Sequence, residues 1–196
     1  MSAPFAFTAE NEAQAQAAIA KYPEGRQASA VLALLDLAQR QNEGWLSRAA
    51  IEYVAERLAM PVIGVEEVAT FYSMFNLRPV GRHLVQVCTT TPCWLRGSDA
   101  VLGACRESLG VEVGGTSEDG LFTLVEVECL GACCNAPMMQ INDDYYEDLD
   151  AEATRRVLEA LRRGETPAAG SQTGRHTSEP VGGPTTLKDA GAAGET

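Results

Sequence analysis

The sequence HLVQVCTTTPCW, residues 83–94, determines the architecture, because a strand-like run ends on a cysteine and passes at once into a loop with a second cysteine. The same arrangement returns in FTLVEVECLGACC, residues 122–134. Short runs rich in β-branched residues are typical of strands. Each predicted strand therefore delivers one cysteine pair, Cys88 with Cys93 and Cys129 with Cys133.

The spacing of these pairs indicates a binuclear metal site. One pair is C-x4-C and the other C-x3-C, and four thiolates are the ligand set of a [2Fe–2S] cluster. Two bridged irons need longer loops than one ion, with backbone N–H groups facing the sulfurs, and residues 89–91 and 130–132 suit this because Gly131 permits close approach. Structural zinc usually takes C-x2-C pairs, and disulfide frameworks belong mainly to short extracellular domains. Spacing alone leaves zinc or buried structural cysteines open.

Two further cysteines fall outside the pairs. Cys105 lies on the apolar stripe of a predicted helix with Val101 and Leu102, which favours a buried small hydrophobe. Cys134 directly follows Cys133 and is an alternative ligand if the loop shifts. We favour Cys133 as the ligand, because Cys134 would point the other way.

Composition limits the classes of partner. The chain has 196 residues and a formal net charge of −12, whereas a nucleic-acid-binding protein needs a basic face. No apolar run reaches the length of a membrane span, and the first residues lack a basic region followed by an apolar core. We therefore expect no nucleic-acid partner, no direct membrane insertion and a reducing compartment.

Changes in hydrophobic periodicity predict an α+β protein. Residues 1–80 show helical periodicity of their apolar residues, for example with Val31, Leu34 and Leu35 on one face. This pattern predicts an N-terminal helical bundle. The pattern in residues 81–164 predicts the order strand, helix, strand, strand, helix. Ser47 is expected to cap a helix of the bundle, and Asp150 to cap the last helix of the second domain. Residues 165–196 are rich in Gly, Pro, Ala, Ser and Thr and predict a disordered tail.

Residues 46–76 also resemble a helix-turn-helix DNA reader, but charge argues against it. The second helix carries Glu66 and Glu67 and no Lys or Arg, so it would repel a phosphate backbone. The nearby aromatic residues Phe71, Tyr72 and Phe75 predict core packing or a partner surface.

Other candidate sites are weaker. His83 precedes a strand and His176 lies in the tail, so neither is expected to be a ligand or base. The acidic run between Asp143 and Glu152 is explained mainly by turn and cap chemistry, with binding of a hard cation as the minor alternative.

Two long runs carry a family resemblance. VATFYSMFNLRPVGRHLVQVCTTTPCWLRGSDAV and VECLGACCNAPMMQINDDYYEDL resemble the thioredoxin-fold [2Fe–2S] subunits of the NADH dehydrogenase module of respiratory complex I. The resemblance spans about residues 11–163. It implies a thioredoxin-like βαββα ferredoxin domain after the helical bundle, a cis proline at Pro137, and one [2Fe–2S] cluster as cofactor. It also implies the cluster ligands, which are Cys88, Cys93, Cys129 and Cys133.

The resemblance further implies a function. Each iron in such a cluster has four sulfur ligands, so the expected chemistry is one-electron transfer, with no catalytic residue of the chain's own. No G-x-G-x-x-G follows a strand, so NADH and flavin are expected on a partner subunit of the complex I peripheral arm. The chain would then be an enzyme subunit of NADH:quinone oxidoreductase, cytoplasmic and peripheral to the inner membrane through the complex. The alternatives are the equivalent subunit of an NAD-linked hydrogenase or formate dehydrogenase, or a zinc-stabilised adaptor without redox activity.

Overall fold

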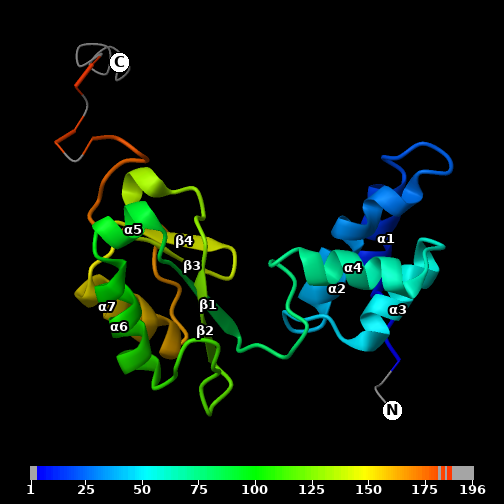
Figure 1. The fold of residues 1–196 in the computed structure, drawn as a ribbon, viewed down its shortest axis with the longest axis horizontal. Helices are drawn as coiled ribbons and strands as arrows, with labels where there is room; N and C mark the ends of the chain where they lie inside the picture. Colours follow the sequence, from blue (N-terminus) through cyan, green and yellow to red (C-terminus); the bar gives the residue numbers. More distant parts are fainter. Residues whose placement is uncertain (1–3, 181, 184, 187–196) are drawn as a thin grey trace. The chain divides into compact units, whose positions relative to one another are not determined.

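A computed structural model describes residues 4–180, 182, 183, 185 and 186. The chain divides between Arg82 and His83 into two compact units, one helical and one built on a sheet (Figure 1). Among the described residues, no helix is long and apolar enough to span a membrane.

The N-terminal unit is a helical bundle, as predicted. Its core contains Leu34, Leu35 and Val54, which have no exposed surface. Ser47 caps the third α-helix as expected, because its Oγ accepts a hydrogen bond from the amide of Ala50 at 3.2 Å. The elements are α1 (Ala9–Ile19), η1 (Gln27–Ala30), α2 (Val31–Gln41), α3 (Arg48–Arg57) and α4 (Val62–Phe71).

Apolar side chains at the end of α4 divide between core and surface. Phe75 is buried in the bundle. Phe71 is 80% exposed, and Tyr72 and Met74 are also exposed. The prediction of core packing is thus confirmed for Phe75, while the neighbouring side chains form an apolar surface.

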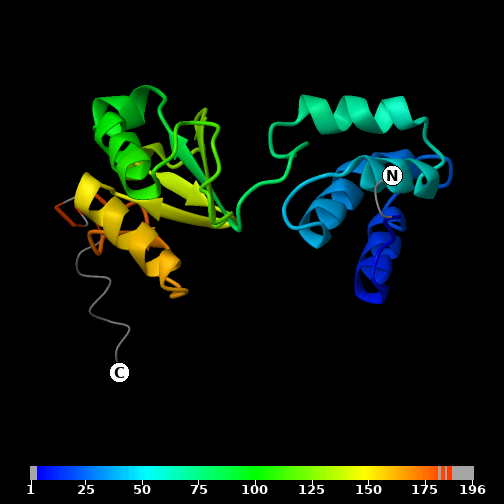
Figure 2. The same cartoon turned by 90° about the horizontal axis from the view of Figure 1, so that it is seen from below.

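The second unit contains a mixed five-stranded sheet in the order β2-β1-β3-β4-β5. α6 and α7 lie side by side and pack against it through one apolar core (Figure 1, Figure 2). The predicted order strand, helix, strand, strand, helix is confirmed, with short additions. The elements are β1 (His83–Cys88), α5 (Thr91–Leu95), α6 (Ser98–Leu109), β2 (Phe122–Val127), η2 (Cys133–Asn135), β3 (Met139–Ile141), β4 (Asp144–Glu147), α7 (Ala151–Arg162) and β5 (Gly170–Ser171).

Strands β1 and β2 place both cysteine loops at one edge of the sheet. They are parallel, and Cys88 at the end of β1 pairs in register with Val127 at the end of β2. Parallel strands end at the same edge, so the loops that follow them emerge together. Strand β3 is antiparallel to β1 on its other side, and it brings Met139 opposite Val87.

The segment after α7 differs from the predicted disordered tail. Residues 170–171 form β5, which is parallel to β4, and the Gln172 amide donates to the carbonyl of Glu147 at 2.9 Å. Composition indicated disorder because the segment has few large apolar residues, but polar contacts hold residues 165–180 to the domain. The prediction for residues 181, 184 and 187–196 lies outside the described residues.

Candidate metal centre

The first cysteine pair is built into the junction of β1 and α5. Cys88 is the last residue of β1, and Cys93 lies in the short helix that follows. Both side chains are 1% exposed, and they pack in a small cluster with Ala136 and Met138. This pair is therefore held by regular structure and by the core.

The second pair lies in the loop after β2. Cys129 and Cys133 are both exposed, and their Sγ atoms are 3.3 Å apart. Gly131 between them adopts a φ of +86°, a conformation that residues with a Cβ rarely take. The Tyr145 hydroxyl donates to the carbonyl of Leu130 at 2.8 Å and so ties this loop to β4.

The thiols influence one another within each pair. Burial, with a smaller contribution from Cys88, raises the pKa of the Cys93 thiol to about 12. Burial alone would raise the pKa of the Cys88 thiol. Hydrogen bonds from the hydroxyl and amide of Thr90 outweigh burial, so the pKa of Cys88 lies below its usual value. In the second pair, hydrogen bonds from the Gly131 amide and from Cys133 lower the pKa of Cys129.

Charge on one pair also affects the thiols of the other pair. The pKa of Cys133 is raised, first by its hydrogen bond to Cys129 and also by the charge of Cys88. The charge of Cys133 in turn raises the pKa of Cys93. Four neighbouring thiolates repel one another, and a bound metal centre relieves that repulsion as it displaces their protons.

Backbone N–H groups face the sulfur atoms, as the sequence predicted for the two loops. The Gly131 amide donates to Cys129 Sγ at 3.4 Å. The amides of Thr90 and Leu130 lower the pKa of Cys88 by hydrogen bonding, and the Met138 amide acts in the same way on Cys93. Such donors stabilise thiolates and the sulfurs of iron–sulfur clusters.

This donor set fits a [2Fe–2S] cluster. Two loops each contribute two thiols. Each iron of such a cluster takes two protein ligands, so one pair can bind each iron. Within the part of the chain that the structure describes, no three His, Cys, Asp or Glu side chains are grouped as ligands of a single metal ion.

The other sequence candidates occupy structural positions. Cys105 is fully buried in the core under α6, as predicted, and burial raises its pKa to about 12. The Ala136–Pro137 peptide is cis, which confirms that expectation. Asp150 caps α7, since its Oδ1 accepts from the Ala153 amide at 2.7 Å. His83 is the first residue of β1 and stacks on the ring of Phe122.

Sequence reasoning missed two groups that act on the first pair. The Thr90 hydroxyl lies 3.3 Å from Cys88 Sγ, although only its backbone was expected to contribute. The Met138 amide acts on Cys93 by hydrogen bonding. No local pattern in the sequence marked either group.

The fold and the two cysteine pairs together define an iron–sulfur protein with a thioredoxin-like domain. The chain belongs to the thioredoxin-like [2Fe–2S] ferredoxin family, whose model matches residues 15–162. A [2Fe–2S] cluster is therefore its cofactor.

Comparison with individual proteins adds two named relatives and one solved structure. A subunit of NADH-quinone oxidoreductase from Rickettsia bellii is 56% identical over 158 residues, which cover 81% of this chain and 95% of the relative. "NADH dehydrogenase [ubiquinone] flavoprotein 2, mitochondrial" of Dictyostelium discoideum is 50% identical over 184 residues, which cover 94% of this chain and 74% of the relative. A solved NAD+-reducing [NiFe]-hydrogenase matches with a TM-score of 0.59 and 20% identity, over 66% of this chain and 23% of that chain. At that identity, the hydrogenase match shows a shared fold.

Proposed function

We propose that this chain is the electron-transfer subunit of an NADH-quinone oxidoreductase, with one [2Fe–2S] cluster bound by Cys88, Cys93, Cys129 and Cys133. The observation that carries the proposal is the placement of two cysteine pairs directly after the parallel strands β1 and β2, so that both pairs lie at one edge of the sheet. Relatives with 56–58% identity that are named as subunits of this enzyme support it.

The residues around the site define what the protein contributes. A cluster with four thiolate ligands has no open iron position and supplies one-electron transfer. The thiolates accept hydrogen bonds from amides of both loops, which favours their charged form. Exposed Glu126 and Glu128 beside Cys129, and the net charge of −12, oppose the arrival of an electron. We therefore expect a low reduction potential.

NADH and flavin then bind to a partner subunit of the peripheral arm. Trp94 and Leu95 are 58% and 71% exposed directly beside Cys93, and they offer apolar surface near the site. In the helical unit, Phe71 and Met74 offer a second apolar surface. Exposed apolar groups of this kind are common at protein–protein interfaces. Assembly with that partner gives the chain a cytoplasmic position, peripheral to the inner membrane.

The equivalent subunit of an NAD-linked hydrogenase or formate dehydrogenase is the alternative. The same fold and the same four thiols would serve there, and the likeness to the hydrogenase structure fits it at the level of fold. We favour the quinone-linked enzyme because the relatives with 56–58% identity carry that name.

Anaerobic purification of the full chain, followed by iron and sulfide analysis and EPR, tests the cofactor assignment. We expect about two irons and two sulfides per chain, and an EPR signal that appears only after reduction. A colourless chain that holds zinc, and that fails reconstitution with iron and sulfide, would instead establish the zinc-stabilised adaptor. Co-purification with a flavin subunit that reduces quinone from NADH, without hydrogenase or formate dehydrogenase activity, would separate the proposed enzyme from its alternative.

A further inference from the structure

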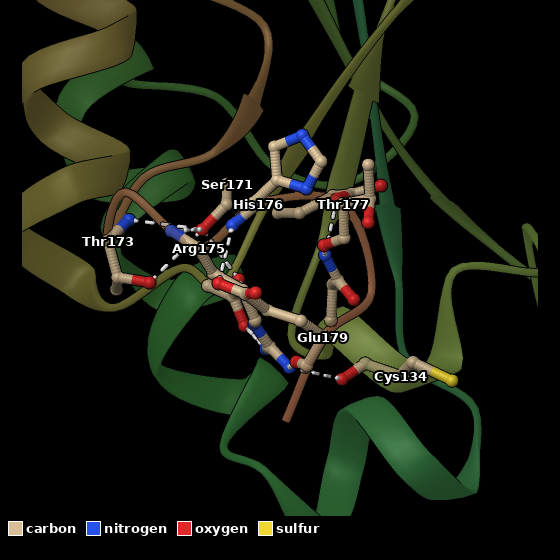
Figure 3. A network of polar contacts seen from close by, with 10 residues as sticks. Cys134, Ser171, Thr173, Arg175, His176, Thr177 and Glu179 are labelled. Carbon is tan, nitrogen blue, oxygen red and sulfur yellow. Dashed lines mark hydrogen bonds and ion pairs between the residues drawn. The ribbon is translucent and has the colours of Figure 1, made fainter. Parts of the chain in front are cut away.

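Residues 170–179, which begin with β5, form a strap beside the second cysteine loop (Figure 3). Its central residue is Arg175, whose side chain is 9% exposed and is paired with the Asp148 carboxylate, 7% exposed. Ser171 Oγ donates to the same carboxylate at 2.7 Å. A buried Arg–Asp pair with such support fixes the strap firmly against the end of β4.

The guanidinium of Arg175 connects three parts of the chain. Its Nε donates to Asp148 Oδ2 at 3.0 Å, and its Nη2 donates to the other carboxylate oxygen. Its Nη1 donates to the carbonyl of Cys134 at 3.1 Å and to the carbonyl of Glu179, also at 3.1 Å. A planar group with five donors suits this task, which the ammonium of Lys would not reproduce.

Asn135 provides a second connection between strap and loop. Its Nδ2 donates to the carbonyl of Thr177 at 2.7 Å and to Glu147 Oε2 at 2.8 Å. Its own carbonyl accepts from the Asp148 amide at 2.8 Å. The two residues that follow Cys133 are thus both held by the strap or by the end of β4.

These contacts set the rotation of the η2 turn, where Cys133 and Cys134 are neighbours. In a 3-10 turn, consecutive side chains diverge by roughly 120°, so only one of the two thiols can face a common centre. Cys133 Sγ faces Cys129 Sγ at 3.3 Å. The side chain of Cys134 extends away from Arg175, while its carbonyl points toward the guanidinium (Figure 3).

We propose that Arg175 is a positioning residue that selects Cys133, rather than Cys134, as the fourth cluster ligand. This inference rests on the proposed function, because it takes the cluster at the four thiols as given. A rotation of η2 that presented Cys134 would carry the Cys134 carbonyl and Asn135 away from Arg175 and Thr177. While the strap is in place, those hydrogen bonds oppose the exchange of ligands.

The test compares the effect of Cys134→Ser in two backgrounds of the full chain, reconstituted anaerobically with iron and sulfide. In the native background, we expect Cys134→Ser to leave the EPR spectrum of the reduced cluster unchanged. In Arg175→Met, the spectrum should become mixed, and Cys134→Ser should remove the added component. Arg175→Met should also lose iron to a chelator roughly tenfold or more faster, as is common when a group that orients a metal ligand is removed.

Two controls separate positioning from general damage. Arg155→Met removes a cation from an exposed ion pair with Glu107 on the helices, so its EPR spectrum and iron loss should match the native chain. Asp148→Asn/Arg175→Met removes both charges of the buried pair, so it avoids a lone buried charge but still lacks the donor to Cys134. We expect it to show the same mixed spectrum as Arg175→Met.

The outcomes distinguish this inference from the function on which it rests. A native chain that binds no cluster refutes the proposed function and the ligand choice with it. With a cluster in the native chain, the inference alone is refuted if Cys134→Ser is silent in both backgrounds, or if it changes the native spectrum. Amide hydrogen exchange at Asn135 and Ala136 in the cluster-free chain adds an independent reading, since it should accelerate in Arg175→Met but not in Arg155→Met.

Discussion

The two cysteine loops reach the same site but are stabilised in different ways. Cys88 and Cys93 are 1% exposed and belong to a strand and a helix, so the core of the domain fixes them. Cys129 and Cys133 are exposed. Cys129 lies in the loop after β2 and Cys133 begins the short η2 turn, and Tyr145 and the strap support this segment through polar contacts. Half of the site is thus part of the fold, whereas the other half depends on a few polar contacts.

The largest expected effect comes from removing the thiols of the buried loop. Cys88→Ser/Cys93→Ser should reduce iron from about two per chain to almost none, because one iron loses both protein ligands. Iron analysis and EPR measure this, with Cys134→Ser as the matched control that should retain the cluster. Native iron content in the double variant would show that these thiols are not ligands.

The next largest effect is a difference in thiol reactivity between the loops in the cluster-free chain. Cys129 is exposed and its pKa is lowered, so its thiolate forms at lower pH than that of an ordinary cysteine. Cys93, with a pKa of about 12, is only about one part in ten thousand thiolate at pH 8. Mass spectrometry after brief alkylation should find Cys129 modified first and Cys93 among the last. Equal rates at both positions would contradict the contrast between the loops.

The strap should contribute measurably to the stability of the sheet unit. Arg175→Met leaves the buried Asp148 carboxylate without its partner, which should lower the free energy of unfolding by about 3–5 kcal/mol. Denaturant unfolding measures the change. Asp148→Asn/Arg175→Met should recover most of the loss, and Asn tolerates the φ of +52° at that position. A double variant as unstable as the single one would mean that the cost lies elsewhere.

The smallest effect concerns the backbone of the second loop. Gly131→Ala should cost about 1–2 kcal/mol because of the φ of +86°, since nothing lies within 4 Å of the added Cβ. Gly103→Ala is the matched control, because that glycine also has open space but lies within α6, where Ala is favoured by up to about 1 kcal/mol. Unfolding measurements should therefore give opposite signs for the two substitutions.

Local patterns in the sequence predicted most of the fold and the four candidate ligands. Caps such as Ser47 and Asp150, and the end of β1 at Cys88, are set by neighbouring residues, so they can be read from short stretches. The second strand was expected to reach Cys129, whereas β2 ends at Val127. The family resemblance supplied the cis proline at Pro137, which local patterns do not specify.

The strap could not be predicted in this way. Arg175 and Asp148 are 27 positions apart, and a single arginine in a tail of Gly, Pro, Ser and Thr gives no periodic signal. Its partners become apparent only when β4 and η2 have been brought together by the fold. The exposure of Phe71 was also not predictable, because helical periodicity cannot distinguish a core position from an exposed apolar one.

The position of Arg175 in the chain also sets an order of events during synthesis. A ribosome releases the chain from its N-terminus, so the four proposed ligand cysteines and Cys134 emerge before Arg175 does. The nascent domain therefore passes through a stage in which both neighbouring thiols are present and the strap is not. If Arg175 selects Cys133 as we propose, that selection begins only when the segment around Arg175 has been translated.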